Sequence, residues 1–418
     1  MSDAVELFPA GTDVQDGVLR ISGCRVDDLA REFGTPAIVV AEPALRARAR
    51  EYRDELVKRW PDGRVVFASK AFPATAVQRV MVEEGLGLDV AGGGEILSAL
   101  RAGVDPALIV MHGNAKSSEE LELAVRAGVG LVVADNADDI DRLEAIVPPG
   151  SHQDVLVRIV PGIESETHPH VQTGQVGSKF GLTPPAASAL IDRIRRSDRV
   201  RIRGVHAHVG SQIMTPQALA AAVAPLAAMG EFPVYDLGGG LGARYTYAEH
   251  PASVAEYLDA LIGAARAHLP AGAQVIIEPG RSMVNETAAT LYTVTTVKRD
   301  ARPFVAIDGG MGDNLEVALF EQRYEAVLAT RIGEPAQEEA VVVGRHCESG
   351  DVLIDGVALP AARVGDLLAV PATGAYTHTM ANNYNGYRRP PVVFANDGAA
   401  RAVIRRETWD DLFARDVP

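Results

Sequence analysis

Short apolar runs rich in valine and isoleucine recur through the first two thirds of the chain. Each run is followed by a polar or glycine-containing turn and then by an amphipathic segment, an alternation typical of parallel strands joined by helices. Eight such runs occur, at residues 65–68, 87–90, 108–111, 130–133, 154–160, 202–208, 234–237 and 274–277. Eight strand and helix repeats predict an α/β fold with a closed TIM-like (β/α)8 barrel rather than an open sheet.

The pattern changes after about residue 285, where Thr- and Val-rich runs are separated by turns. These runs lie at 289–297, 304–308, 339–343, 352–354, 366–370, 391–395 and 401–405. They predict a second, mainly antiparallel β domain, to which the apolar run 18–21 could add a strand. We therefore expect an N-terminal segment 1–35 that joins the β domain, a barrel over 36–285 and the β domain over 286–418.

Composition narrows the classes of protein to which the chain can belong. With 418 residues, 47% of them hydrophobic and 23% charged, the chain is long and apolar enough to bury a substantial core. The net charge of −15 and the dispersed basic residues argue against nucleic acid or an anionic membrane as a partner.

The sequence contains neither a recognisable targeting signal nor a cysteine motif typical of disulfides or zinc sites. The acidic N-terminus lacks the order of a signal peptide, and the longest apolar stretch, residues 218–229, is too short to span a membrane. The two cysteines, Cys24 and Cys347, are far apart and form no CxxC motif, which argues against a disulfide framework and a structural zinc site. We expect a cytoplasmic protein without a metal.

Polar residues follow the apolar runs, where the active site of a barrel enzyme forms. Each one alone has an ordinary explanation, such as a lysine that reaches water or a histidine satisfied in the core. Their recurrence at matching positions favours a functional site at this end of the barrel. The residues are Lys70, Asp89, His112 with Asn114, Asp135, Pro161 with Gly162, His208, the turn 238–242 and Glu278.

The glycine turn Gly238-Gly-Gly-Leu-Gly242 suggests a phosphate site, because glycines let backbone N–H groups approach an anion. Its spacing and its late position do not fit a dinucleotide fingerprint, but late strands of a barrel commonly hold phosphate. Together with Lys70 after the first strand, this suggests pyridoxal phosphate, whose aldehyde forms a Schiff base with lysine. Glu278 could keep the pyridine nitrogen protonated, although a salt bridge with Arg281 would also explain it.

Eight motifs resemble those of the diaminopimelate decarboxylase family, in the same order, from about residue 15 to the C-terminus. The resemblance implies a fold-type III pyridoxal-phosphate enzyme with a cofactor-binding barrel, a β domain and a head-to-tail homodimer with two shared active sites. The motifs are Phe67-Ala-Ser-Lys70, Leu88-Asp-Val-Ala-Gly-Gly-Gly-Glu95, Ser178-Lys-Phe-Gly181, His206-Ala-His-Val-Gly-Ser-Gln212, Asp236-Leu-Gly-Gly-Gly-Leu-Gly242, Glu278-Pro-Gly-Arg281, Cys347-Glu-Ser-Gly-Asp351 and Gly374-Ala-Tyr376.

The resemblance assigns roles to individual residues. Lys70 corresponds to the Schiff-base lysine, His208 to the histidine that stacks on the ring, and Glu278 to the partner of the pyridine nitrogen. Cys347 resembles the proton donor that reaches in from the other subunit. The other cofactor-binding candidates are Asp89, Ser211, Gly239, Gly240, Gly242, Gly280, Arg281 and Tyr376; the substrate-binding candidates are Arg281, Glu316, Phe320, Glu348 and Tyr376.

One segment departs from the family. Where the family usually has Arg-Pro-Ala-Leu-Tyr, whose Arg and Tyr help to hold the distal end of the substrate, this chain has Glu316-Val-Ala-Leu-Phe320. A carboxylate at this position would repel a distal carboxylate and favour a distal amine or guanidinium. We therefore expect a substrate related to diaminopimelate with an altered distal end, unless a shifted loop lets Arg323 or Tyr324 restore the contacts.

Three function classes compete. The leading hypothesis is an amino-acid decarboxylase acting on meso-diaminopimelate or, in view of Glu316 and Phe320, on a relative of it. An alanine-racemase-like enzyme would share the barrel, lysine and β domain, but Cys347-Glu-Ser-Gly-Asp351 favours decarboxylation. A non-catalytic pyridoxal-phosphate carrier is usually a barrel alone, and the extra β-type sequence counts against it.

Overall fold

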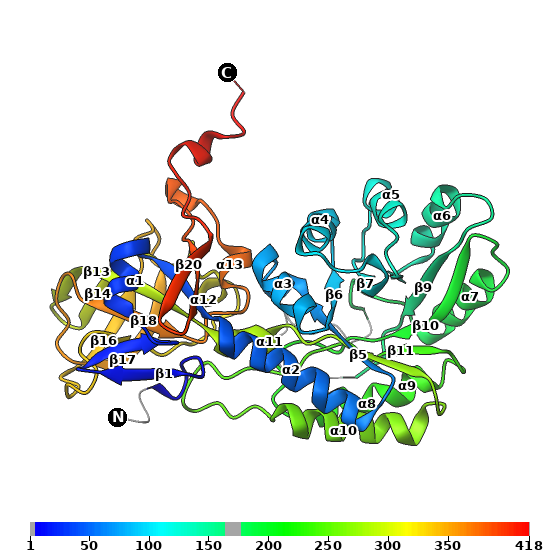
Figure 1. Cartoon of the computed structure of the whole chain (residues 1–418), viewed down its shortest axis with the longest axis horizontal. Coiled ribbons are helices and arrows are strands. Elements are labelled where there is room, and N and C mark those ends of the chain that lie inside the picture. The colour runs from blue at the N-terminus through cyan, green and yellow to red at the C-terminus, as the bar shows by residue number, and fades with distance from the viewer. Residues whose placement is uncertain (1–4, 164–176, 418) are drawn as a thin grey trace. The chain divides into compact units, whose positions relative to one another are not determined.

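The computed structural model of the chain describes residues 5–163 and 177–417. The chain folds into two compact units, shown in Figure 1. The first, here called the β unit, comprises Met1–Ala47, Ala243–His250 and Met283–Pro418; the second, the barrel unit, comprises Arg48–Gly242 and Pro251–Ser282. Residues 243–250 thus leave the barrel sequence and belong to the β unit.

Eight parallel strands close into a barrel in the barrel unit, as the spacing of apolar runs predicts. Each strand pairs with the next along the chain, and the last pairs with the first. The strands are β5 (Gly63–Ala68), β6 (Gly87–Val90), β7 (Ile109–Met111), β8 (Leu131–Ala134), β9 (Gln153–Arg158), β10 (Val200–His206), β11 (Val234–Asp236) and β12 (Gln274–Ile277). Apolar side chains from six of these strands pack together as one buried cluster, so the inside of the barrel is filled.

Helices follow the barrel strands and cover them from outside (Figure 1). Two of them begin with a capping box, in which Ser117 pairs with Glu120 and Ser253 with Glu256. The helices are α2 (Glu42–Arg59), which begins in the β unit, α3 (Thr75–Glu83), α4 (Gly93–Ala102), α5 (Ser118–Ala127), α6 (Ala137–Ile146), α7 (Pro184–Ile194), α8 (Gln217–Ala221), α9 (Val223–Ala227) and α10 (Val254–His268), with short turns η2 (Ser69–Ala71) and η3 (Pro106–Leu108).

A nine-stranded mixed sheet forms the β unit, and most of its strand pairs are antiparallel. Two pairs, β14 with β16 and β19 with β4, are parallel. The strands are β4 (Ala37–Ala41), β13 (Ala288–Arg299), β14 (Pro303–Ile307), β15 (Val327–Leu328), β16 (Glu338–Val343), β17 (Val352–Leu359), β18 (Leu367–Pro371), β19 (Val392–Asn396) and β20 (Ala399–Ile404). A main antiparallel character is therefore confirmed.

Strand β4 lies in this sheet, although the sequence places its residues at the start of the barrel. It pairs with β13 on one side and β19 on the other, and all five of its residues are buried. A strand buried on both faces reads like a barrel strand, which is why the pattern alone does not assign it to a unit.

Smaller elements complete the β unit. A three-stranded sheet of β1 (Thr12–Gln15), β2 (Val18–Ile21) and β3 (Cys24–Arg25) precedes helix α1 (Val26–Phe33). The remaining elements are α11 (Arg281–Val284), which begins in the barrel unit, η5 (Asn285–Thr287), α12 (Glu316–Leu319), α13 (Thr377–Met380), η6 (Tyr384–Gly386) and η7 (Asp410–Phe413). Among the helices of residues 5–163 and 177–417, none is both long and apolar enough to cross a membrane.

Candidate active site

Polar side chains gather at the carboxyl ends of the barrel strands, where the sequence places them. Lys70 lies in the turn η2 directly after β5 and is exposed. Asp89 lies in β6, His112 directly after β7, and Glu278 directly after β12, and these three are buried. In a parallel barrel these ends form one mouth, so the fold brings the four groups to a common site.

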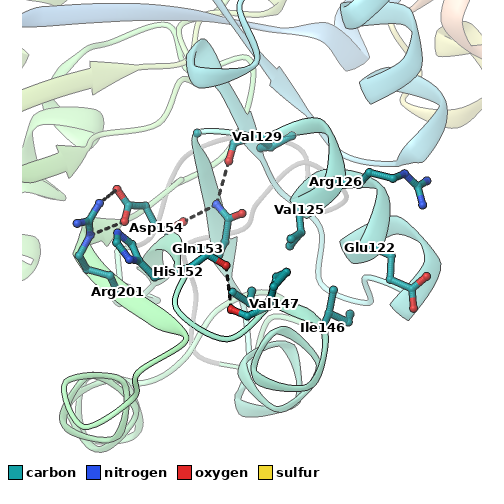
Figure 2. Close-up of a pocket in the computed structure, with 14 residues that line it drawn as sticks. Glu122, Val125, Arg126, Val129, Ile146, Val147, His152, Gln153, Asp154 and Arg201 are labelled. Atoms are coloured by element: carbon teal, nitrogen blue, oxygen red, sulfur yellow. Dashed lines mark hydrogen bonds and ion pairs between the residues drawn. The ribbon is translucent and has the colours of Figure 1, made fainter.

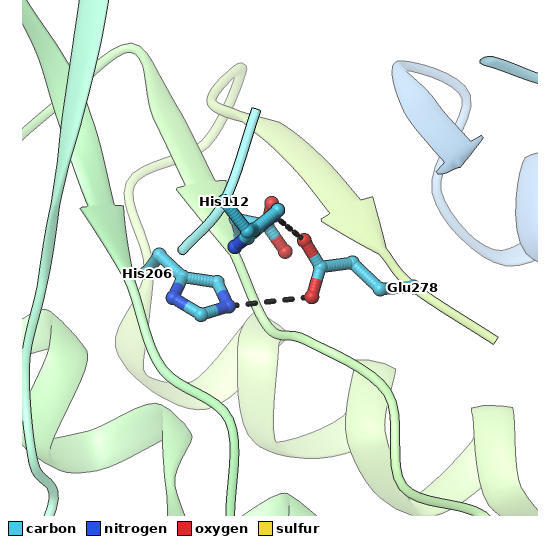
Figure 3. A group of neighbouring side chains, drawn as sticks. His112, His206 and Glu278 are labelled. Carbon is cyan, nitrogen blue, oxygen red and sulfur yellow. Dashed lines mark hydrogen bonds and ion pairs between the residues drawn. The ribbon is translucent and has the colours of Figure 1, made fainter. Parts of the chain in front are cut away.

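Glu278 is held between two histidines (Figure 3). Its Oε1 atom lies 2.5 Å from Nε2 of His112, and its Oε2 atom lies 3.3 Å from Nε2 of His206. Asp236, at the end of β11, belongs to the same group, and one nitrogen or oxygen atom of each of the four residues lies within 4.8 Å of the others.

Burial and neighbouring charges shift the pKa values of these residues in different directions. Burial opposes the charge of Glu278, but His112 and His206 together bring the pKa of its carboxyl well below the ordinary value. Burial, with the nearby Glu278 charge, raises the pKa of Asp236 well above its ordinary value. Burial also lowers the pKa of His206 to about 4. Burial and the neighbouring charges thus make Glu278 the more acidic of the two carboxyls.

The glycine turn after β11 packs tightly against its neighbours. A Cβ atom at Gly239 would lie 2.0 Å from the carbonyl oxygen of Glu278, and one at Gly240 would lie 2.5 Å from that of Gly210. Gly240 also has a φ of +123°, a region that side-chain-bearing residues avoid. Only glycine therefore allows this turn to approach Glu278 and the loop after β10.

The other cofactor-binding candidates of the barrel unit lie in the same loops. The Nδ1 atom of His208 accepts a hydrogen bond of 3.3 Å from the backbone N–H of Gly239. Arg281 donates through Nε to the hydroxyl of Ser211 at 3.2 Å. Burial and the nearby Lys70 ammonium both lower the pKa of His208. The structure thus brings Lys70, His208, Ser211, the glycine turn and Glu278 to one end of the barrel.

These residues fit pyridoxal phosphate. The glycines of the turn have no side chain that would keep a phosphate from their backbone, and the buried Glu278 offers a carboxylate of lowered pKa to a protonated ring nitrogen. Lys70, an exposed residue at the same end of the barrel, supplies the amine with which an aldehyde forms a Schiff base.

Comparison with known proteins agrees with this chemistry. Residues 43–285 match the family model described as pyridoxal-dependent decarboxylase, pyridoxal binding domain. The chain is 40% identical to the diaminopimelate decarboxylase of Bacillus subtilis, over 99% of this chain and 98% of that protein. It is 42% identical to that of Actinosynnema pretiosum, over 98% and 95%.

The chain belongs to the diaminopimelate decarboxylase family. It is a pyridoxal-phosphate-dependent decarboxylase, a carboxy-lyase, and the racemase and carrier hypotheses are not favoured. The solved diaminopimelate decarboxylase of M. jannaschii in complex with L-lysine superposes with a TM-score of 0.91 at 29% identity, covering 97% of this chain and 98% of that one. Family membership therefore agrees with the shared barrel and β unit.

The loop with Cys347 and Glu348 lies in the β unit, and both residues are exposed. The backbone N–H of Cys347 donates to Oδ1 of Asn385 at 3.0 Å, and the Tyr384 hydroxyl donates to Glu348. The buried Asp351 ends the motif and fixes the loop, because its carboxylate accepts the N–H groups of Met311 at 2.7 Å and His346 at 2.8 Å. The loop therefore presents a thiol and a carboxylate on a firmly anchored turn.

Two other candidates of the β unit, Tyr376 and Phe320, are half-buried. Tyr376 precedes α13 and has a φ of +60°, an uncommon backbone conformation for a bulky residue. Such strain persists only where the surroundings fix it, which is consistent with a side chain that must point in a set direction.

Glu316 has no exposed surface. Its Oε2 atom accepts hydrogen bonds from the hydroxyls of Tyr324 at 3.0 Å and Tyr245 at 3.2 Å, and the two tyrosine rings meet edge to face. Arg323, the other residue considered for this region, is exposed. The fold thus buries the Glu316 side chain beside the hydroxyls of two tyrosines.

The sequence indicates His112 as a polar residue at a strand end but assigns it no role, and it does not indicate His206 and Asp236 as site residues. A signal for the last two is nevertheless present. His206 and Asp236 are the last residues of β10 and β11, and each precedes a loop residue that was selected, His208 and Gly238. Side chains at alternate positions of a strand share a face, so His206 could have been grouped with His208.

A separate cavity of about 640 Å³ lies at the opposite, amino ends of barrel strands β8 and β9 (Figure 2). Some of its polar groups contact one another: Arg201 forms a double contact with Asp154 at 2.6 and 2.9 Å, and Gln153 donates to the carbonyl of Val129 at 2.9 Å. Catalytic groups of barrel enzymes gather at the carboxyl ends, so this cavity is not the active site.

Proposed function

We propose that the enzyme removes carbon dioxide from an amino acid that matches diaminopimelate at its reacting end and lacks the carboxylate at its distal end. The observation that carries this proposal is Glu316. It replaces the arginine of the family motif, and it is buried with a carboxylate oxygen that accepts two tyrosine hydroxyls.

The surroundings of Glu316 support this substrate class. An arginine fork binds a carboxylate through paired charge-assisted hydrogen bonds, which a glutamate cannot make. Tyr324 is committed to Glu316 and to Asn314, so its hydroxyl is not simply a substitute for the missing tyrosine at Phe320. The Glu316 carboxylate also adds negative charge where the family has a cation.

The remaining residues supply the reaction's common steps. Bound pyridoxal phosphate supplies an electron sink for the pair left on the α-carbon when carbon dioxide departs. Lys70 would hold the cofactor covalently, Glu278 would pair with its ring nitrogen and His208 would stack on the ring. Asp89, Ser211, Gly239, Gly240, Gly242, Gly280 and Arg281 would bind the cofactor, Tyr376 would touch cofactor and substrate, Glu348 would contact the substrate, and Cys347 would return a proton to the α-carbon.

We test the substrate class with a panel of amino acids scored by release of carbon dioxide. The panel contains meso-diaminopimelate, lysine, ornithine, arginine and glutamate-like compounds. We expect the highest kcat/KM for a compound without a distal carboxylate. A kcat/KM for meso-diaminopimelate of about 10⁴ M⁻¹s⁻¹ or above, exceeding all others, would show that Glu316 does not exclude that substrate.

We also propose a homodimer in which each active site takes Lys70 from one copy and Cys347 from the other. Lys70→Ala and Cys347→Ala chains, each nearly inactive, should then regain activity when mixed. If copies exchange freely at equal amounts, about half of the dimers are mixed and each holds one intact site, so about a quarter of wild-type activity should return. Verified mixed dimers that stay inactive would contradict the shared site.

A cytoplasmic location is proposed from the state of the cysteines. Both are free, Cys24 buried and Cys347 exposed. An exposed catalytic thiol is best preserved in a reducing compartment, where disulfides are rare.

A further inference from the structure

His112 and His206 are fixed by the barrel backbone before they meet Glu278. The backbone N–H of His112 donates to the carbonyl of Val90 at 2.7 Å. His206 ends β10, in register with Asp236 of β11 and Arg158 of β9. Their rings approach edge to face, with centroids 4.8 Å apart. Their approach to the carboxylate is therefore set by the strands rather than by mobile loops.

The two histidines meet different oxygens of one carboxylate. His112 reaches Oε1 and His206 reaches Oε2, so the plane of the carboxylate cannot rotate without losing a contact (Figure 3). Both rings and Glu278 are buried, with 8%, 1% and 5% of their surface exposed. A carboxylate in so dry a place stays ionised only where donors or cations compensate the loss of water.

The other titratable groups around Glu278 include both acids and bases. Asp89 lies 3.7 Å from His112 through its Oδ1 atom and competes for the same imidazole. The titratable or charged groups that face this cluster from the surrounding elements are Lys70 after β5, Asp89 in β6, Glu95 in α4, Arg158 in β9, His208 after β10, Asp236 in β11 and Tyr257 in α10. Among these groups, Asp236 also reaches the Glu278 carboxyl with its side chain, and the two histidines contact its two different oxygens.

We propose that His112 and His206 are positioning residues that hold the Glu278 carboxylate ionised and fixed in direction, so that it can receive the protonated pyridine nitrogen of the cofactor. The inference rests on the proposed pairing of Glu278 with that nitrogen. It goes beyond that pairing because it makes His112 and His206 responsible for the charge and orientation of the carboxylate. Neither histidine is assigned a contact with phosphate or substrate above.

The test measures the ring nitrogen directly. Apoprotein is loaded with ¹⁵N-labelled pyridoxal phosphate, and the ¹⁵N chemical shift reports whether the nitrogen carries a proton. The dissociation constant of the cofactor is measured in parallel by equilibrium dialysis. We expect a protonated nitrogen in the wild type, and loss of the protonated signal near neutral pH with at least tenfold weaker cofactor binding in His112→Leu and His206→Leu. His206→Gln keeps an N–H donor and should retain most of the protonated signal.

Controls separate this inference from its premise. His268→Leu, at an exposed position near the end of α10, should leave the nitrogen signal and cofactor affinity unchanged, and circular dichroism shows whether each variant is folded. Glu278→Gln should lose the protonated signal. If Glu278→Gln loses it while both leucine variants keep it with unchanged affinity, the role of the histidines is refuted. If Glu278→Gln itself keeps the signal, the pairing of Glu278 with the nitrogen is refuted as well.

Discussion

Replacing Lys70 with alanine should remove the covalent link between the chain and pyridoxal phosphate and lower decarboxylation by about a thousandfold or more. Lys70 is exposed in a short turn after β5, so its removal costs little packing and the variant should fold. The cofactor is bound to wild type and variant, reduced with borohydride, and located by peptide mass spectrometry. Only the wild type should carry a pyridoxyl group, and it should lie on Lys70.

The matched control is Lys58→Ala, an exposed lysine near the end of α2. It should keep both the adduct and the activity. A reducible adduct that persists at a normal level in Lys70→Ala, for example on the buried Lys116, would show that another lysine holds the cofactor.

The barrel could be predicted from the sequence because each strand corresponds to a short run of neighbouring residues. A run such as 87–90 or 274–277 is short, apolar and bounded by turns, and the structure places β6 and β12 at these residues. Since parallel strands all end at one mouth, the residue after each run could be assigned to a common site without knowledge of any long-range contact. Lys70 and Glu278, which are about 200 residues apart, were grouped in this way.

The network behind the site could not be predicted because it depends on contacts across the barrel. His112 and His206 are useful only as a pair, and their pairing requires the distance between the ends of β7, β10 and β12. The same limit applies to Glu316. Its replacement of arginine is visible in the sequence, but its burial with Tyr245, which lies about 70 residues earlier, follows from the fold.

A double substitution in the segment that contains Glu316 should have the second large effect, on substrate specificity. Glu316→Arg combined with Phe320→Tyr restores the two side chains of the family motif. We expect the ratio of kcat/KM for meso-diaminopimelate to that for the best native substrate to rise by about a hundredfold or more. Charge-assisted hydrogen bonds contribute on the order of 1.5 to 3 kcal/mol each, and the double variant both adds a fork and removes a repelling charge.

A second variant keeps this prediction testable if the arginine disturbs the cluster around Tyr245 and Tyr324. Glu316→Gln removes the negative charge but keeps the size and an oxygen that can accept from the same hydroxyls. It should shift the ratio in the same direction by a smaller factor, because it ends the repulsion without supplying the fork.

The control for net charge is Glu321→Arg, which makes the same change in charge on an exposed neighbour in the same segment and should leave the ratio unchanged. If the folded double variant and Glu316→Gln both leave the ratio at the wild-type value, position 316 does not set the distal specificity. If Glu321→Arg shifts the ratio as much as the double variant, long-range charge rather than a local contact decides it. A shift confined to the variants at position 316 follows only if the buried carboxylate acts locally, since an exposed charge is screened by solvent and salt within about 10 Å.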